Sequence, residues 1–281
     1  MITRPDPDRP GATLTATNVV LAAIDNSAAA RPVLAVARKL APLWDATVIA
    51  IRVDENHDTV AGSAALASGV ALRVEHGDAV GCVAGSAADD AVVAVVMGLR
   101  GRPGGPRPAG HVAMELITVC TKPVVVVPPD MQQHGNLQRI VVALEGSMDT
   151  SAALRPLLER ARAHGVFATA VHVDDEHALP AFSDQPQYES AAFAEEFTAR
   201  YAPVSAVGIS GPTQLELRIG EPPEQVLAVC DQTEADLLVV AWSCNLAPGH
   251  ARFVRTILAD AKIPVMLVPV STRRHSVTKD S

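Results

Sequence analysis

The sequence repeats itself, and this repeat limits the folds open to the chain more than any other feature. Three blocks recur in the same order, which indicates a tandem duplication. An apolar run that ends in an acid and a small polar turn occurs at 18–27 (NVVLAAIDNS) and at 139–147 (RIVVALEGS). The other matched blocks are VEHGD with LRIGE, at 74–78 and 217–221, and KPVVVVPP with IPVMLVPV, at 122–129 and 263–270.

Each half alternates apolar strands with helical segments. The strands are apolar throughout, which is typical of a parallel sheet covered by helices on both faces. In the first half the pattern predicts strands over 19–25, 46–53, 71–76, 91–98 and 124–127, helices over 30–44, 79–88 and 112–121, and a segment of small residues over 56–68. The second half repeats this order and adds a fuller helix over about 189–201. The predicted fold class is α/β: two tandem doubly wound domains, each with a five-stranded, mostly parallel sheet and helices on both faces.

The repeat also predicts the domain boundaries. We expect a first domain over 17–130 and a second over 137–270, preceded by a disordered lead over 1–16 and followed by a tail over 271–281. No apolar run reaches about 18 residues, so we expect no membrane span. The N-terminal residues lack a hydrophobic signal core.

Charge and cysteine usage narrow the class of protein further. The formal net charge of −8 argues against a general nucleic-acid binder, which should be basic. The four cysteines, Cys82, Cys120, Cys230 and Cys244, contain no CxxC pair and lie in apolar surroundings. We therefore expect reduced core thiols in a cytoplasmic protein.

Three features converge at one edge of the predicted first sheet. Asp25 follows the first strand, Val53 ends the second, and Gly98 ends the fourth. In doubly wound sheets, ligands sit beyond the carboxyl ends of the strands. From Gly98 the loop GLRGRPGGPRPAGHV leads into a helix N-terminus, whose free N–H groups favour an anion.

These residues resemble the universal stress protein family, in its tandem two-domain form. The resemblance rests on VVLAAIDNS, the Gly77 and Gly220 turns, VVMGLRG, GHVA and KPVVVVP, and it covers nearly the whole predicted folded chain. It implies a Rossmann-like fold similar to the adenine nucleotide alpha hydrolases. In nucleotide-binding members, a motif of Gly, two residues, Gly, nine residues and Gly-Ser or Gly-Thr surrounds the ATP phosphates, while the acid after strand one and the end of strand two hold ribose and adenine.

The first domain keeps this arrangement of motif and strand ends, with two departures. Gly98 and Gly101 match the first two glycines, but only eight residues separate Gly101 from Gly110, and His111 stands where the hydroxyl residue belongs. Prolines in the loop remove backbone donors, and Arg100 is one of three arginines that can pair with phosphate instead. The resemblance implies a weakened site for ATP or another adenine nucleotide, with no metal beyond nucleotide-associated Mg. The residues implied are Asp25, Val53, Gly98, Arg100, Gly101, Gly110, His111 and Val112.

The second domain departs further from the nucleotide-binding pattern. Ala241 and Cys244 replace the first two glycines, and Ala251-Arg252 stand where Gly-Ser would. A Cβ atom at these positions blocks close approach of the backbone to phosphate. Glu145 replaces the shorter acid. We therefore expect a degenerate site here.

Alternatives to nucleotide binding stay open at this point. The loop after Gly98 is equally compatible with an exposed Gly/Pro connection, and Asp25 with a cap on the turn at Asn26-Ser27. The rival function is a nucleotide-free interaction or structural protein, and a weak ATP hydrolase is a third. No motif supplies a nucleophile, a base and an orienting group, so no catalytic residue is predicted. The resemblance also implies that the apolar fifth strands pair antiparallel between the two domains, and that they also provide a homodimer interface.

Overall fold

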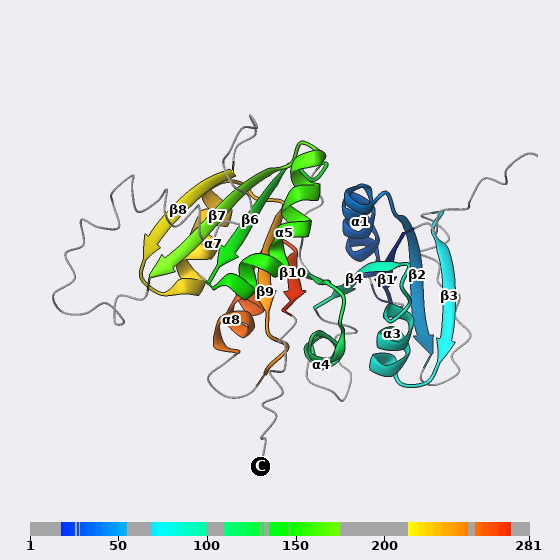
Figure 1. Cartoon of the computed structure of the whole chain (residues 1–281). Helices are drawn as coiled ribbons and strands as arrows, with labels where there is room; N and C mark the ends of the chain where they lie inside the picture. The colour runs from blue at the N-terminus through cyan, green and yellow to red at the C-terminus, as the bar shows by residue number, and fades with distance from the viewer. Residues whose placement is uncertain are drawn as a thin grey trace, which may run out of the picture.

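The computed structural model describes residues 18–25, 27, 29–54, 69–99, 110–129, 131, 135–145, 147–174, 213–246 and 251–270. These residues form ten strands in one sheet, in the order β3-β2-β1-β4-β5-β10-β9-β6-β7-β8 (Figure 1). All neighbouring pairs are parallel except β5–β10, which is antiparallel. The predicted α/β fold with two five-stranded domains is confirmed.

The first domain contains β1–β5 and the second contains β6–β10. In the first, the elements are β1 (Val19–Ala23), α1 (Ala30–Leu40), the 3-10 helix η1 (Ala41–Trp44), β2 (Thr47–Asp54), β3 (Ala71–His76), α3 (Ala79–Ala87), β4 (Val92–Gly98), α4 (His111–Val119) and β5 (Val124–Val127). In the second, they are β6 (Arg139–Leu144), α5 (Met148–Ala163), β7 (Phe167–Asp174), β8 (Thr213–Ile219), α7 (Pro222–Gln232), β9 (Leu237–Trp242), α8 (Arg252–Asp260) and β10 (Val265–Pro269).

The predicted elements of the first domain match the observed ones to within about two residues, with one difference in type. The first helix changes to a 3-10 helix at Ala41, where Pro42 cannot donate the next α-helical hydrogen bond. Asp78 caps α3 as predicted, by accepting a hydrogen bond from the Gly81 N–H at 2.7 Å. The predicted segments 56–68 and 189–201 lie outside the described residues, as do the expected lead and tail.

The strand registers repeat between the two domains. Val20 lies opposite Val48 on β2, and Ile140, 120 residues later, lies opposite Ala168 on β7. Gly98 lies opposite Val127, whereas Ala241 lies opposite Val268. These pairs reproduce the offsets of the sequence blocks, so the positions matched in sequence are also matched in the hydrogen-bonded sheet.

The two domains share a continuous core on each face of the sheet. On one face, α1, η1 and α5 bury a single apolar cluster that includes residues of both domains. On the other, α3, α4, α7 and α8 bury a second such cluster. The β5–β10 pair lies at the centre of both: Met266 and Val125 belong to the first cluster, while Leu267 and Val124 belong to the second.

The β5–β10 pairing confirms one expectation and corrects another. The fifth strands pair antiparallel between the two domains, as expected, and each also has a parallel neighbour on its other side. Both edges of β5 and of β10 are therefore occupied. A homodimer through the apolar fifth strands has no free strand edge to use, so that predicted interface is wrong.

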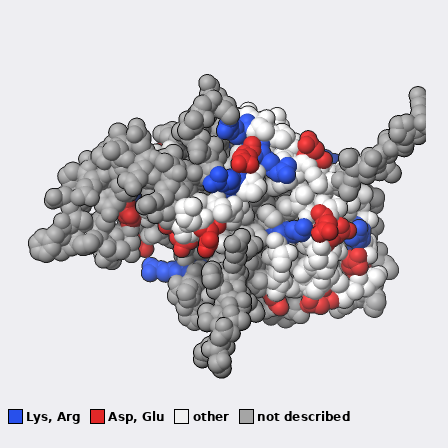
Figure 2. Space-filling model, viewed as in Figure 1, with Lys and Arg blue, Asp and Glu red and all other residues white. Residues whose placement is uncertain are grey.

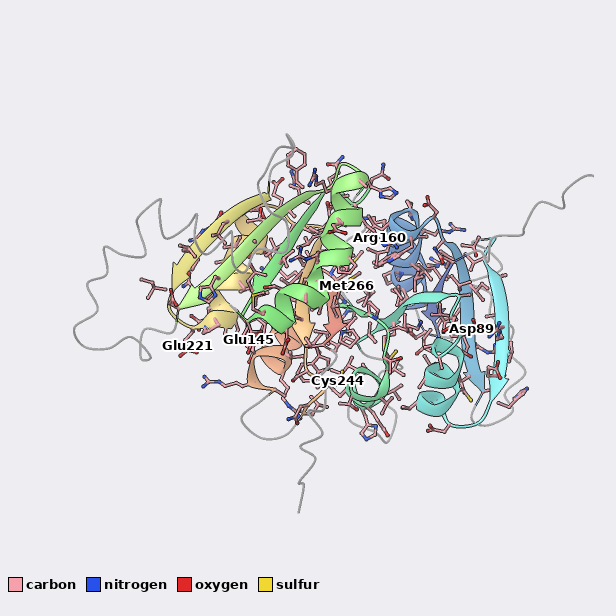
Figure 3. The ribbon with its side chains drawn as sticks, in the orientation of Figure 1. Asp89, Glu145, Arg160, Glu221, Cys244 and Met266 are labelled. Atoms are coloured by element: carbon pink, nitrogen blue, oxygen red, sulfur yellow. The ribbon has the colours of Figure 1, made fainter. Side chains whose placement is uncertain are left out.

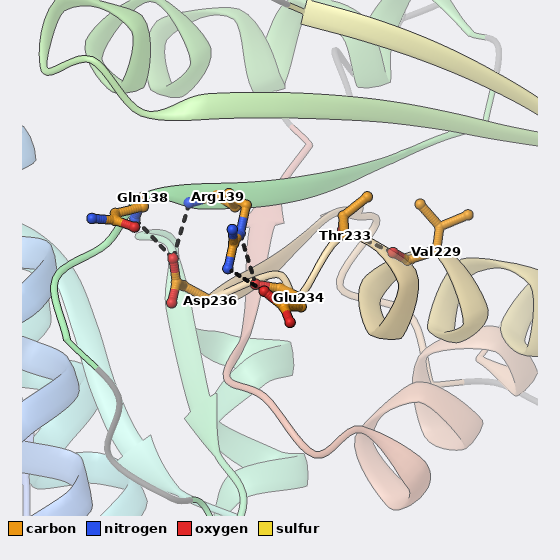
Figure 4. A network of polar contacts seen from close by, with 6 residues as sticks. All are labelled: Gln138, Arg139, Val229, Thr233, Glu234 and Asp236. Atoms are coloured by element: carbon orange, nitrogen blue, oxygen red, sulfur yellow. Dashed lines mark hydrogen bonds and ion pairs between the residues drawn. The ribbon is translucent and has the colours of Figure 1, made fainter.

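Polar contacts connect β6 and β9 of the second domain at the amino-terminal ends of these strands (Figure 4). Asp236 Oδ2 accepts hydrogen bonds from the N–H groups of Gln138 and Arg139, at 2.8 and 2.9 Å. The Arg139 guanidinium contacts Glu234 Oε2 at 3.0 Å. This network fixes β6 beside β9 at the end of the sheet opposite to the expected ligand edge.

The four cysteines are free thiols, and Cys120 and Cys230 are buried. In the part of the chain that is described, no helix is both long and apolar enough to cross a membrane. On the face drawn in Figure 2, basic and acidic side chains lie interspersed.

Cys230 gives a testable pH dependence. Burial, together with the neighbouring Asp231 charge, raises the pKa of this thiol from 9.0 to about 12. Between these values the unfolded chain releases a proton that the folded chain keeps, so the free energy of unfolding should fall as pH rises above 9, by about 1.4 kcal/mol per pH unit. Chemical denaturation of the natural chain and of Cys230→Ala at several pH values measures this slope. An equal slope in both proteins contradicts the assignment.

Candidate functional site

The carboxyl ends of β1, β2 and β4 meet at one edge of the first domain. The strands are parallel neighbours, and Ala23 near the end of β1 lies opposite both Ile51 of β2 and Met97 of β4. The Ile24 N–H donates to the Ile51 carbonyl at 2.9 Å, which extends this alignment past the end of β1. Residues that follow these strands are therefore held close to one another.

Val53 lies on the face that also carries α4. Its half-buried side chain packs against the apolar cluster formed with α3 and α4, and Leu99 and Val112 border the same cluster. Val53 at the end of β2, Leu99 after β4 and Val112 in the first turn of α4 thus border one apolar cluster, although Val53 lies 46 positions before Leu99 and 59 before Val112.

Asp25 is exposed and shapes the turn that follows β1. Its Oδ1 accepts hydrogen bonds from the N–H and the hydroxyl of Ser27, at 2.9 and 2.5 Å. The Ser27 hydroxyl in turn accepts from the Ala29 N–H at 3.2 Å. The alternative prediction, that Asp25 caps this turn, is correct. Its second oxygen, Oδ2, has no hydrogen bond within the described residues.

Gly110 and His111 form the start of α4. Gly110 has φ 93°, in the left-handed region that favours glycine, and a Cβ atom there would lie 3.3 Å from the Leu99 carbonyl oxygen. Among the described residues, no side chain caps the first turn of α4, and that turn contains no acid. His111 is half exposed, with its Nδ1 3.5 Å from Glu115 Oε2. N–H groups at the start of a helix favour an anion, and this helix start lies next to the residue that follows β4.

The described part of the chain contains six of the eight residues implied for the site. Asp25, Val53 and Gly98 lie at the strand ends, and Gly110, His111 and Val112 lie at the helix start. Arg100 and Gly101 lie outside the described residues. Among the described residues, no group of three or more His, Cys, Asp and Glu side chains could hold a metal ion.

The corresponding edge of the second domain has different contacts. Ala251 replaces Gly110 before the helix, with φ −109°, and its side chain is buried. Cys244, which replaces Gly101, has a left-handed φ of 58°. Glu145 is exposed, and Ser147 instead caps the following helix by accepting from the Thr150 N–H at 3.3 Å.

Trp242 is a residue whose role the sequence did not reveal. It is buried at the end of β9, and its indole Nε1 donates to the Ile117 carbonyl of α4 at 3.0 Å. Ile117 lies in the last turn of α4, where carbonyl groups lack partners within the helix. Figure 3 shows Cys244, two residues on, beside α4. The second domain therefore uses its strand end to hold the far end of the helix that begins at His111.

Polar side-chain pairs lie at the ends of β2 and β7 on the other face of the sheet, and the Arg52–Asp54 pair is the more buried of the two. Arg52 pairs with Asp54, and at the matched positions His172 Nε2 lies 3.4 Å from Asp174 Oδ1. Because side chains alternate along a strand, Arg52 points away from the face of Ile51 and Val53. These pairs stabilise the strand ends but lie across the sheet from the candidate site.

Comparison with known proteins identifies the family. Residues 136–269 match the model of the Universal stress protein family, and no protein of curated function matches the sequence significantly. A universal stress protein from Archaeoglobus fulgidus DSM 4304 is 14% identical, with a TM-score of 0.63 over 90% of this chain and 98% of its own. A functionally unknown protein from Pseudomonas aeruginosa PAO1 is 12% identical, with a TM-score of 0.64 over 91% and 93%. The second domain belongs to the universal stress protein family, the first domain shares its fold, and the resemblance noted in the sequence is confirmed.

The Trp242 hydrogen bond predicts that replacing Trp242 by Phe lowers the free energy of unfolding more than replacing Trp44 by Phe. Trp242→Phe keeps most of the buried ring but leaves the Ile117 carbonyl without its donor, which should cost about 1–3 kcal/mol of stability beyond the change in packing. Trp44→Phe is the matched control, because Trp44 is also buried and its indole N–H has no hydrogen bond within the described residues. Urea unfolding of both variants measures the difference. An equal loss in both contradicts the role of the Trp242 hydrogen bond.

Proposed function

We propose that this chain is a universal stress protein that binds an adenine nucleotide at the carboxyl-terminal edge of its first domain. The observation that supports this most is the convergence of Asp25, Val53 and the uncapped start of α4 at that edge. It acts in the cytoplasm as a stress-response or regulatory protein through binding, without a dedicated catalytic centre.

Adenine and ribose bind at the ends of β1 and β2. Val53 offers an apolar surface to the base, because its half-buried side chain borders the cluster under α4. Asp25 Oδ2 accepts hydrogen bonds from ribose hydroxyls, while Oδ1 stays bound to Ser27 and keeps the carboxylate oriented. A charge-assisted hydrogen bond of this kind is stronger than a neutral one.

The phosphates bind between the end of β4 and the start of α4. The first-turn N–H groups of α4, including those of His111 and Val112, supply donors and the positive end of the helix dipole. Gly98, Gly101 and Gly110 allow the backbone to approach, and Arg100 adds charge. The His111 ring supplies an N–H in place of the missing hydroxyl. Magnesium accompanies the nucleotide.

The backbone at Gly110 bears on whether a phosphate group fits at the start of α4. Its φ of 93° is strained for any L-residue with a Cβ, and that Cβ would crowd the Leu99 carbonyl at 3.3 Å. The position thus needs glycine to begin α4 next to the end of β4. Ala251 at the matched position has a buried side chain, which supports one nucleotide site per chain rather than two.

Calorimetric titration tests the proposal. ATP should give saturable heat with about one site per chain, and Asp25→Asn should weaken binding by about tenfold or more, since it removes the charge from a hydrogen bond to ribose. No heat at millimolar ATP with a folded sample contradicts the proposal.

Asp89→Asn is the matched control for Asp25→Asn. Asp89 Oδ1 accepts from the Ala91 N–H at 2.9 Å, the same turn geometry as Asp25 with Ser27, but just before β4 begins. It therefore lies at the opposite end of the strands. The control should bind ATP as the natural chain does; equal losses in both variants indicate a general effect on folding and contradict a ribose contact.

A further inference from the structure

The sheet ends in two outer strands, β3 and β8. Each has a single hydrogen-bonded neighbour among the described residues, and Figure 1 shows them at opposite ends of the molecule. Backbone N–H and C=O groups along such an edge can pair with another strand. Because β5 and β10 are interior, these two edges are the places in the described sheet where another chain can add a strand.

Strand β3 exposes an apolar residue between two opposite charges. Val74 is 42% exposed, Arg73 is exposed and Glu75 is half-buried. Arg73 and Glu75 lie opposite Ile51 and Val53 of β2, so both side chains point to the face that carries α3. Neither has an ion pair or side-chain hydrogen bond within the described part of the chain.

We propose that two copies of this chain associate through β3, antiparallel and about a two-fold axis at Val74. In this register Val74 lies opposite Val74 of the second copy. Arg73 lies opposite Glu75 of the second copy, and by symmetry Glu75 lies opposite its Arg73. The sequence of β3 is thus self-complementary in charge, and each dimer contains two such pairs on one face of the joined sheet.

Strand β8 has the same pattern with the signs exchanged, which makes it a poorer partner. Glu216 and Arg218 occupy the positions matched to Arg73 and Glu75, and they already pair with each other at 2.6 Å. Arg218 also donates to Gln232 at 2.6 Å. In an antiparallel β3–β8 contact centred on Val74 and Leu217, Arg73 would face Arg218 and Glu75 would face Glu216. Like charges therefore oppose a β3–β8 contact. Because Arg218 already contacts Glu216 and Gln232 within the chain, β3 rather than β8 presents unpaired opposite charges among the described residues.

The backbone hydrogen bonds and the burial of Val74 provide the attraction, and the charges select the register. Exposed ion pairs contribute little on their own, but like charges placed directly opposite one another on paired strands are destabilising. A register shifted by one residue would place Arg73 and Glu75 on the wrong face relative to their partners.

Charge exchange on β3 tests this interface. Arg73→Glu and Glu75→Arg each place like charges opposite one another, so each should weaken self-association by about tenfold or more, measured by sedimentation or light scattering over a range of concentrations. The double variant R73E/E75R restores opposite charges and should dimerise as the natural chain does. A natural chain that stays at the monomer mass of 29.4 kDa at all concentrations overturns the proposal.

Mixing the two single variants separates the proposed contact from an effect on folding. One presents two acids and the other two bases at positions 73 and 75, so an equimolar mixture should form a one-to-one heterodimer in native mass spectrometry. Glu216→Arg is the control on β8 and should leave dimerisation unchanged. Loss of the dimer only in the β8 control, or single variants that dimerise unchanged, assigns the interface elsewhere and overturns the proposal.

Discussion

The antiparallel pairing of β5 with β10 is the interaction on which the rest of the structure depends. Val124–Val127 and Val265–Leu267 are buried on both faces, so this pair joins the two sheets through the centre of both apolar clusters. Each domain thereby covers an edge that would otherwise be an exposed apolar strand. The same pairing turns β3 and β8 outward, so the fold itself decides which strands remain open to another chain.

The two domains contact opposite ends of α4. Its first turn follows Gly110, which lies close to the Leu99 carbonyl just after β4, and no side chain of the described residues caps it. Its last turn is held by Trp242 of the second domain through the Ile117 carbonyl. The end of β9, which corresponds to the end of β4 at the candidate site, thus has a structural role, because its Trp242 holds α4. A change in the contact between domains would act on the direction of the helix that is proposed to bind phosphate.

The sequence predicted the order and approximate bounds of the strands because apolar runs and proline-bounded ends report directly on buried parallel strands. Asp78 and Pro222 were likewise predictable, since caps depend on local chemistry. The antiparallel pairing of the fifth strands followed from the family resemblance, but the expected homodimer interface through them did not hold, because apolar strands look alike whether they pair within a chain or between chains. The role of Trp242 depends on a carbonyl 125 positions away, a distance over which a single sequence gives no signal. The family match covers the domain whose loop departs most from the nucleotide-binding pattern, so the shared core, rather than that loop, identifies the family.

Photolabelling of the natural protein with an azido-adenine analogue of ATP, followed by peptide mapping, tests most directly whether one adenine nucleotide binds in the first domain and none in the second. We expect label on peptides that contain Val53 or the start of α4 at His111, and loss of that label when excess ATP competes. Label concentrated between Cys244 and Arg252, or label that ATP does not displace, would contradict it.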